Sequence, residues 1–240
     1  MGLQEALQLL YPPQCISCQS PVQSDFGLCA DCWRETPFIS GLVCDQCGVP
    51  LPGDDPGERA LCDDCMAIAR PWDRGRAALM YRDNGRRLVL ALKHGDRMDL
   101  ARPASAWMLR AAQPILTSEM LVVPVPLHWT RLFRRRFNQA ALLARSVARA
   151  AGLDHCPDAL VRTRTTGSQE GKTRDARFAN LVGAFRVPKA RERRVQGREI
   201  LLVDDVMTSG ATFAGATEAL FAAGARSVSV LGLARVAKDG

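Results

Sequence analysis

Residues 200–212 constrain the fold more than any other stretch, because they join a strand, two carboxylates and a turn of small residues. The four apolar residues that open this stretch predict a strand buried on both faces, as in a parallel sheet covered by helices. Small residues at 208–211 predict a turn, and residues 213–223 predict a helix that ends at Gly224. We therefore expect an α/β protein.

Two carboxylates, Asp204 and Asp205, lie at the carboxyl end of the predicted strand, where open α/β sheets bind ligands. Such a pair can accept hydrogen bonds from two neighbouring ribose hydroxyls. The N–H groups of the turn and the positive end of the helix dipole can hold a phosphate. The pattern predicts a site for a ribose 5-phosphate group. An acidic strand end followed by an ordinary loop is the alternative, and the ordered combination of residues disfavours it.

The same stretch resembles the phosphoribosyl diphosphate (PRPP) binding motif of the type I phosphoribosyltransferases, in which an apolar strand precedes Asp-Asp and a Thr-Ser-Gly-x-Thr turn. The resemblance implies that Asp204 and Asp205 hold the 2′ and 3′ hydroxyls of the ribose. It also implies that the turn holds the 5′-phosphate. The turn residues are Thr208, Ser209, Gly210, Ala211 and Thr212.

Eight of the nine cysteines form four Cys-x-x-Cys pairs before residue 66, which is a strong signal for metal binding. Each tight turn can present two thiolates to a tetrahedral ion, so two turns complete a four-sulfur structural zinc site. Pairing neighbouring turns gives two zinc ribbons; pairing the first turn with the third and the second with the fourth is the alternative. The sequential sets are Cys15, Cys18, Cys29 and Cys32, and Cys44, Cys47, Cys62 and Cys65.

Charge divides the chain near residue 70. Residues 1–70 contain three Arg and ten Asp or Glu, a net charge of −7, whereas residues 71–240 carry +14. We expect a double zinc ribbon over 1–70 and a phosphoribosyltransferase-like domain over 71–240. An acidic module suits docking better than contact with nucleic-acid phosphates, while the basic domain should attract polyphosphates or single strands. Because Asp204 lies more than 150 residues after Cys44, the ribbon is expected to be separable from the ligand motif.

The basic domain alternates predicted strands and helices, which indicates a parallel sheet wrapped by helices. Residues 189–198 are charged and predict a solvated loop. The predicted strands span 76–81, 121–125, 159–162, 183–187, 199–203 and 227–233, and the predicted helices span 86–93, 100–113, 138–151, 172–182 and 212–223.

Two basic segments are candidates for binding a diphosphate. Four arginines lie within residues 131–136, after the strand predicted at 121–125, and Arg131 and Arg136 are our candidates for the pyrophosphate side. A polar, basic segment at 162–181 predicts a lid, in which Lys172 or Arg174 would contact the ligand. A solvated face is the alternative for Arg134 or Arg135 taken singly.

These segments, together with the cysteine pairs, resemble the ComF (competence protein F) family along nearly the whole chain. The family pattern is present at residues 11–18, 92–96, 123–139 and 169–181. One departure is Arg136, which stands where the family commonly has glycine. The resemblance implies a type I phosphoribosyltransferase fold, PRPP with Mg²⁺ as ligand, and a role in DNA uptake or handling during competence.

Three functions from different classes fit the sequence. They are a phosphoribosyltransferase with an unidentified acceptor, a non-catalytic sensor of PRPP or a nucleotide, and a single-stranded DNA-binding accessory protein that acts with competence or DNA-processing proteins. Residues 200–212 support the first two equally, and the charge of +14 favours the third. No apolar run approaches the roughly 20 residues of a membrane span. Residues 1–10 lack the basic start and the cleavage site of a signal peptide, so we expect a cytoplasmic protein with reduced cysteines.

Overall fold

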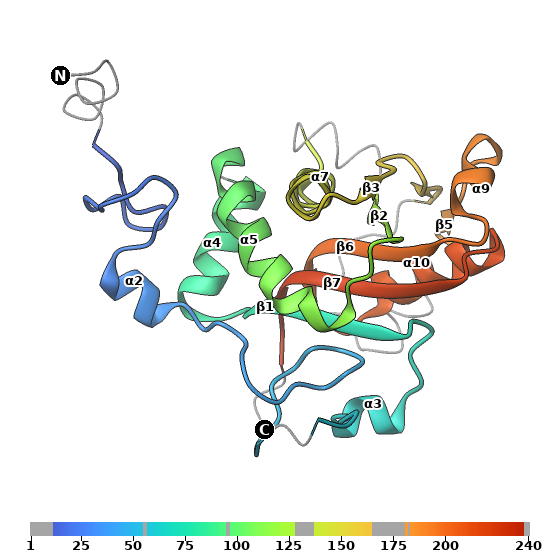
Figure 1. Ribbon diagram of the computed structural model, residues 1–240, viewed down its shortest axis with the longest axis horizontal. Coiled ribbons are helices and arrows are strands. Elements are labelled where there is room, and N and C mark those ends of the chain that lie inside the picture. The colour runs from blue at the N-terminus through green and yellow to red at the C-terminus, as the bar shows by residue number, and fades with distance from the viewer. Residues whose placement is uncertain are drawn as a thin grey trace.

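The computed structural model describes residues 12–54, 57–94, 97–127, 137–164, 181 and 183–237. Its centre is a parallel sheet with the strand order β1-β7-β6-β2-β3, which agrees with the predicted fold class (Figure 1). The strands of this sheet are β1 (Arg74–Met80), β2 (Leu121–Pro124), β3 (Asp154–His155), β6 (Glu199–Met207) and β7 (Ser227–Arg235).

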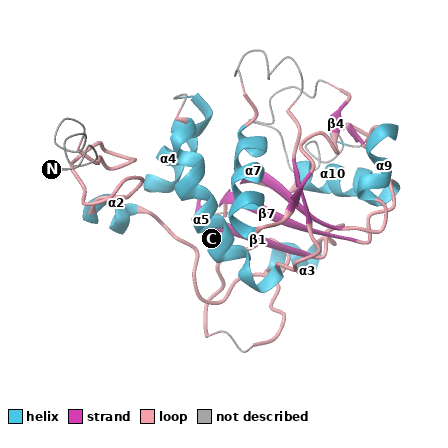
Figure 2. Cartoon of the chain, turned by 45° about the horizontal axis from the view of Figure 1, so that its top comes forward, coloured by secondary structure: helices cyan, strands magenta, loops and turns pink. Residues whose placement is uncertain are grey.

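Helices cover both faces of the sheet (Figure 2). Alternate residues of a strand point to opposite faces, and the apolar residues 200–203 of β6 follow this rule. Leu201 and Val203 pack with the helices of one face, whereas Ile200 and Leu202 pack with the helix that follows β6 on the other. The strand is therefore buried on both faces, as predicted. The helices are α4 (Asp83–His94), α5 (Ala101–Ala112) and α7 (Gln139–Ala151) on one face and α10 (Ala211–Ala222) on the other, with short 3-10 turns η1 (Met98–Leu100) and η2 (Gln113–Ile115).

Helix α7 shows how local sequence places an element beside the end of β2. The side chain of Asn138 caps the helix by accepting the N–H of Ala140 at 3.0 Å. Its amide nitrogen also donates to the carbonyl of Val125 at 3.1 Å. Gly152 ends the helix with φ of +67°, a conformation that favours glycine. The helix predicted at 138–151 is thus confirmed and is tied to β2 at its first turn.

Three expectations for the second half of the domain differ from the structure. The loop predicted at 189–198 is wrong, because α9 (Lys189–Val195) forms there and buries Val195 completely. The strands predicted near 159–162 and 183–187 are the short β4 (Val161–Arg162) and β5 (Phe185–Arg186), which pair antiparallel outside the main sheet. Strand β3 was not predicted. Most of the helix predicted at 172–182 lies outside the described residues.

The two cysteine ribbons attach to different parts of the α/β domain. The first contains α2 (Ala30–Glu35) and meets the start of α4, where the buried Asn84 accepts from the hydroxyl of Ser17 and donates to the carbonyl of Cys32. The second contains α3 (Asp63–Ala67) and lies against β1 (Figure 1). Three cysteines of this second ribbon are buried in the same cluster as the core residues of α10.

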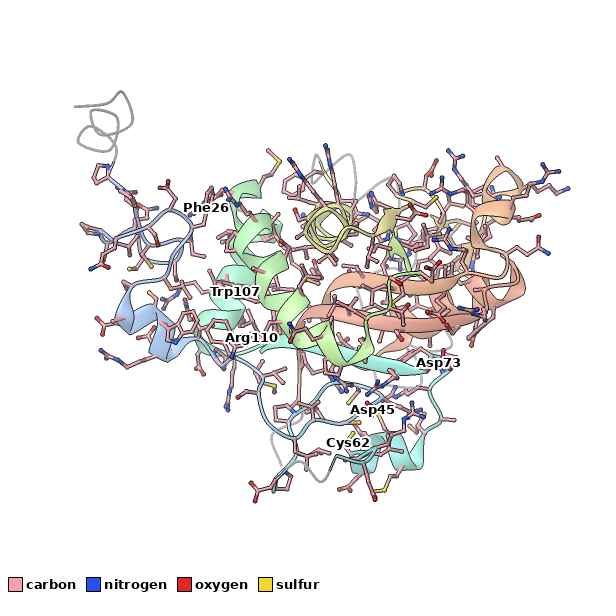
Figure 3. The ribbon with its side chains drawn as sticks, in the orientation of Figure 1. Phe26, Asp45, Cys62, Asp73, Trp107 and Arg110 are labelled. Carbon is pink, nitrogen blue, oxygen red and sulfur yellow. The ribbon has the colours of Figure 1, made fainter. Side chains whose placement is uncertain are left out.

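Asp45 joins the second ribbon to β1, and Figure 3 shows it between the strand and α3. Its buried carboxylate accepts hydrogen bonds from Arg59, Arg74 and Arg76 at 2.7, 2.6 and 2.8 Å. Burial by itself would raise the pKa of Asp45, but these three guanidinium groups outweigh burial and hold the pKa well below its usual range. The carboxylate is therefore charged at neutral pH.

Replacing Asp45 should destabilise the fold strongly. In the Asp45→Asn variant the buried guanidinium of Arg76 loses its counter-charge, and breaking such a buried pair costs about 3 kcal/mol. Urea unfolding followed by circular dichroism measures this loss. Asp158→Asn is the matched control, because Asp158 also contacts an arginine through both oxygens but lies at the surface. Equal midpoints for the parent and Asp45→Asn would contradict the role assigned to Asp45.

Candidate functional site

The eight ribbon cysteines form two compact groups, and the grouping follows the sequential pairing. Within each group the sulfur atoms lie within 4.8 Å of one another. The Sγ atoms of Cys18 and Cys29 are 3.6 Å apart and those of Cys47 and Cys62 are 3.7 Å apart. A tetrahedral zinc ion with Zn–S bonds of about 2.3 Å requires a sulfur separation of ~3.8 Å. The donor sets therefore fit two structural zinc ions, and the alternative pairing of first turn with third is wrong.

The carboxylates of Asp204 and Asp205 belong to β6 itself, because the strand continues to Met207 rather than ending at 203. The two side chains have different partners. An oxygen of Asp205 lies 3.2 Å from the ammonium of Lys93, which comes from α4, and both side chains are largely buried. An oxygen of Asp204 accepts the backbone N–H of Asp205 at 2.8 Å.

Burial, and then the neighbouring charge of Asp205, raise the pKa of Asp204 to about 8. The positive charges of Lys93 and Arg162 act in the opposite direction but are weaker. At neutral pH Asp204 is thus largely protonated in the protein alone. A cation or a pair of hydroxyl groups bound at this point would replace the proton as the partner of the carboxylates.

Two buried arginines bind the carbonyl groups of the turn that follows β6. Arg70 donates from Nη1 to the carbonyl of Ser209 at 2.8 Å. Arg235, at the end of β7, donates from Nη1 to the carbonyl of Met207 at 3.2 Å and to the carbonyl of Thr208. Both arginine side chains lie in the interior. The carbonyl groups of residues 207, 208 and 209 are therefore held by the two arginines and point toward the protein interior.

Fixing these carbonyls also orients the next three N–H groups. In a trans peptide the C=O and N–H bonds point in opposite directions, and the described chain contains no cis peptide bond. The N–H groups of Thr208, Ser209 and Gly210 must therefore point away from the two arginines. Among the described residues, these N–H groups donate to no other backbone carbonyl. Together with the first turn of α10, they offer a set of N–H donors suited to an anion.

Gly210 allows the turn to lie directly against the core. Its φ of +83° favours glycine, and it is the residue that caps α10. A Cβ at this position would lie 2.8 Å from the ring of Trp72 and 3.2 Å from the guanidinium of Arg70. Trp72 is almost fully buried and packs edge-on against Phe213, in the first turn of α10. The shape of the turn thus depends on residues 70–72.

The structure brings part of the predicted site together. Asp204, Asp205 and residues 208–212 follow one another at the carboxyl end of β6, beside the end of β2. The basic segment predicted to bind diphosphate follows β2, but Arg131 and Arg136 lie outside the described residues, as do Lys172 and Arg174.

Four residues of this site did not emerge as candidates from the sequence. They are Arg70, Trp72, Lys93 and Arg235, which reach the site from α4, from β7 and from the segment between α3 and β1. Only Lys93 carried a signal, because it lies in the Leu-Lys-x-Gly-Asp part of the ComF pattern.

Comparisons with known proteins cover both parts of the chain. The double zinc ribbon domain family matches residues 6–66. The DNA utilization protein YhgH of Escherichia coli K12 is 32% identical over 95% of this chain and 99% of its own length. Competence protein F of Haemophilus influenzae is 26% identical over 92% of this chain and 96% of its own length. Competence protein ComFC of Bacillus subtilis is 27% identical over 89% of this chain and 86% of its own length.

Among solved structures, the glutamine PRPP amidotransferase of B. subtilis, complexed with ADP and GMP, overlaps 59% of this chain and 30% of its own. The TM-score is 0.40 at 19% sequence identity, which is too low to assign a ligand here. None of the helices in the described part of the chain is long and apolar enough to span a membrane.

The raised pKa of Asp204 predicts that this residue lowers stability at neutral and alkaline pH. A carboxyl group whose pKa in the folded protein exceeds its ordinary value of 3.8 does not lower the free energy of unfolding below pH 3.8. Above that pH the loss of stability grows until the pH reaches about 8. The Asp204→Asn variant should therefore melt at a higher temperature than the parent at pH 8, by about 3 °C or more, with little difference at pH 4.5. Thermal melts over this range measure it, with the exposed Asp31→Asn as control. An equal rise in melting temperature at both pH values would contradict the raised pKa of Asp204.

Proposed function

The chain belongs to the ComF family of competence proteins, and from that premise we propose that it binds PRPP at the end of β6 and acts in the handling of DNA. One observation carries the ligand assignment: the N–H groups of residues 208–210 are turned outward by two buried arginines, beside a pair of carboxylates. An anion and a diol are thus recognised within a few residues of one another. Four-thiolate zinc sites need reduced cysteines, which supports a cytoplasmic location.

The 5′-phosphate would be bound by the turn. The N–H groups of Thr208, Ser209 and Gly210 donate to its oxygens, and the positive end of α10 adds to the attraction. The hydroxyls of Thr208, Ser209 and Thr212 offer further donors, and Thr208 is exposed. Since the arginines behind the turn fix its carbonyls, the donors are oriented before the ligand arrives. Such preorganisation reduces the entropy cost of binding.

The ribose would be bound by Asp204 and Asp205 through its 2′ and 3′ hydroxyls. Carboxylate oxygens are also the ligands that Mg²⁺ prefers, so the pair fits a magnesium–PRPP complex. When bound, Mg²⁺ would neutralise charge on the diphosphate. Lys93, which pairs with Asp205 in the protein alone, is positioned to exchange this carboxylate for a diphosphate oxygen when PRPP binds.

If the site is catalytic, its main task is to stabilise a departing diphosphate. The bond between ribose C1 and a diphosphate oxygen breaks, its electron pair leaves with the diphosphate, and a nucleophilic atom of the acceptor forms the new bond to C1. Charge therefore grows on the leaving group in the transition state, where Arg131, Arg136 and Lys93 would act. Lys172 or Arg174 would contact the ligand from the segment after β4. Ligand sensing without turnover needs the same binding residues.

Binding of single-stranded DNA by residues 71–240 is a second candidate function. The net charge of +14 favours it, because phosphate neutralisation supplies most of the affinity for a nucleic-acid backbone. The names of the E. coli and H. influenzae relatives, which refer to DNA utilization and to competence, point in the same direction. Competence or DNA-processing proteins are then the partners to expect.

Removing both carboxylates should distinguish the binding of PRPP from the binding of single-stranded DNA. In the variant that combines Asp204→Asn with Asp205→Asn, the loss of two charge-assisted hydrogen bonds should weaken PRPP binding by on the order of 3 kcal/mol, or roughly a hundredfold. Affinity for single-stranded DNA should change little. Titration calorimetry with PRPP and Mg²⁺, beside a fluorescence anisotropy titration with DNA, measures both. An equal loss for both ligands would indicate one shared anion site instead.

The Arg136→Ala variant should show whether Arg136 acts in catalysis or in DNA binding. If Arg136 stabilises departing diphosphate, the substitution lowers the rate of pyrophosphate release more than it lowers affinity for PRPP. If Arg136 contacts a nucleic-acid backbone, binding of every single-stranded sequence weakens alike and the salt dependence falls by about one phosphate contact. A parent protein that releases no pyrophosphate with any base, and a variant with an unchanged salt slope, would exclude both roles for Arg136.

A further inference from the structure

The Cys-x-x-Cys turn at 44–47 does more than present two thiolates. The two residues between its cysteines, Asp45 and Gln46, both bind the α/β domain. Asp45 accepts from the arginines of β1, and the carbonyl of Gln46 accepts the indole N–H of Trp72 at 2.6 Å. A zinc ion held by Cys44 and Cys47 would therefore fix the same turn that fixes Trp72.

The zinc turn and β1 lie too close together for either to move alone. A Cβ on Gly75 would lie 2.3 Å from the carbonyl oxygen of Gln46, and a Cβ on Gly48 would lie 2.9 Å from the backbone of Arg76. The backbones are thus in direct contact on both sides of the turn. Displacement of the turn must displace Trp72 or break the contacts of Asp45.

The second half of the same zinc site leads to the phosphate-binding turn by another route. Cys65 lies in α3, and the chain continues from this helix directly to Arg70. The guanidinium of Arg70 lies 5.6 Å from the centre of the Trp72 ring and donates to the carbonyl of Ser209. Trp72 in turn lies against Gly210. Both pairs of cysteines therefore connect to residues 209–210.

We propose that zinc in the second ribbon orders the phosphate-binding turn, with Arg70 and Trp72 as the positioning residues that transmit its effect. Without the ion, four adjacent thiols lose their common partner, and the turn at 44–47 and helix α3 lose the constraint that holds them together. Arg70 and Trp72 then no longer hold Ser209 and Gly210. The ordering of the turn does not depend on which ligand it binds, whereas the effect on ribose 5-phosphate binding rests on the proposed function.

The first ribbon provides the comparison. Within the described residues 12–32, its hydrogen bonds to the α/β domain go to Asn84, in the first turn of α4, and to Arg97, whose Nη2 donates to the carbonyl of Ile16. Ile16 and the α4 residue Leu88 belong to the apolar cluster of one face of the sheet, whereas Trp72 and α10 belong to the cluster of the other. Loss of zinc from the first ribbon should therefore leave residues 208–212 in place.

The experiment compares Cys47→Ser with Cys18→Ser in the full chain. Metal analysis gives the zinc content, NMR relaxation of ¹⁵N-labelled protein gives the order parameters of amides 208–212, and calorimetry gives the affinity for ribose 5-phosphate. Each variant should retain one zinc ion. In Cys47→Ser the order parameters of these amides should fall from about 0.85 to below about 0.6. The same variant should bind ribose 5-phosphate about tenfold more weakly, as expected when a charged hydrogen bond to the turn is lost. Cys18→Ser should match the parent in both measurements, and an identical response of the two variants would overturn the proposal.

A second variant covers the case in which Cys47→Ser does not fold. Trp72→Phe combined with Arg70→Met keeps all eight zinc-binding cysteines and should retain two zinc ions, yet it should show the same fall in order parameters at 208–212. Unchanged order parameters in this variant would also overturn the proposal. A parent protein that does not bind ribose 5-phosphate would refute the ligand assignment alone, because the relaxation comparison needs no ligand.

Discussion

The contact between the carboxylate of Asp45 and three arginines is the interaction on which the arrangement of the molecule depends. A buried carboxylate is costly by itself, and it is stable here because Arg59, Arg74 and Arg76 surround it. Two of these arginines belong to β1 and one to the ribbon, so the contact joins the two parts of the chain. It also sets the position of the neighbouring Gln46, whose carbonyl holds Trp72. The acidic ribbon and the basic domain are therefore parts of one packed structure.

The candidate site shows how buried cations can prepare a surface for an anion. Arg70 and Arg235 do not face the ligand position; they bind the carbonyls behind it. Because each peptide unit is rigid, holding its C=O from one side directs its N–H to the other. The adjacent Asp204 is held in an environment that disfavours its charge. Such a cost to stability is typical of functional sites, where the ligand supplies the missing partner.

The sequence predicted what depends on neighbouring residues and failed where distant residues meet. Residues 200–212 contain the strand, the two carboxylates, the turn and the start of the helix in one continuous stretch. The close spacing of the cysteines likewise predicts the two zinc-binding sets. Helix α9 escaped prediction because one buried residue, Val195, is enough to anchor a charged helix. Strand β3 contains only two residues and has no pattern of its own. Arg70 contacts the turn across 139 residues of sequence, and no local pattern predicts a contact over such a separation.

The most direct test of the account is a titration of ¹⁵N-labelled protein with PRPP and Mg²⁺, followed by NMR. The account predicts that the amide signals of Thr208, Ser209 and Gly210 shift most strongly, as their N–H groups form hydrogen bonds to the phosphate. Shifts at Asp204 and Asp205 should accompany them as the ribose hydroxyls bind. Saturation of the protein with ligand while these three amide signals stay in place would contradict the central claim.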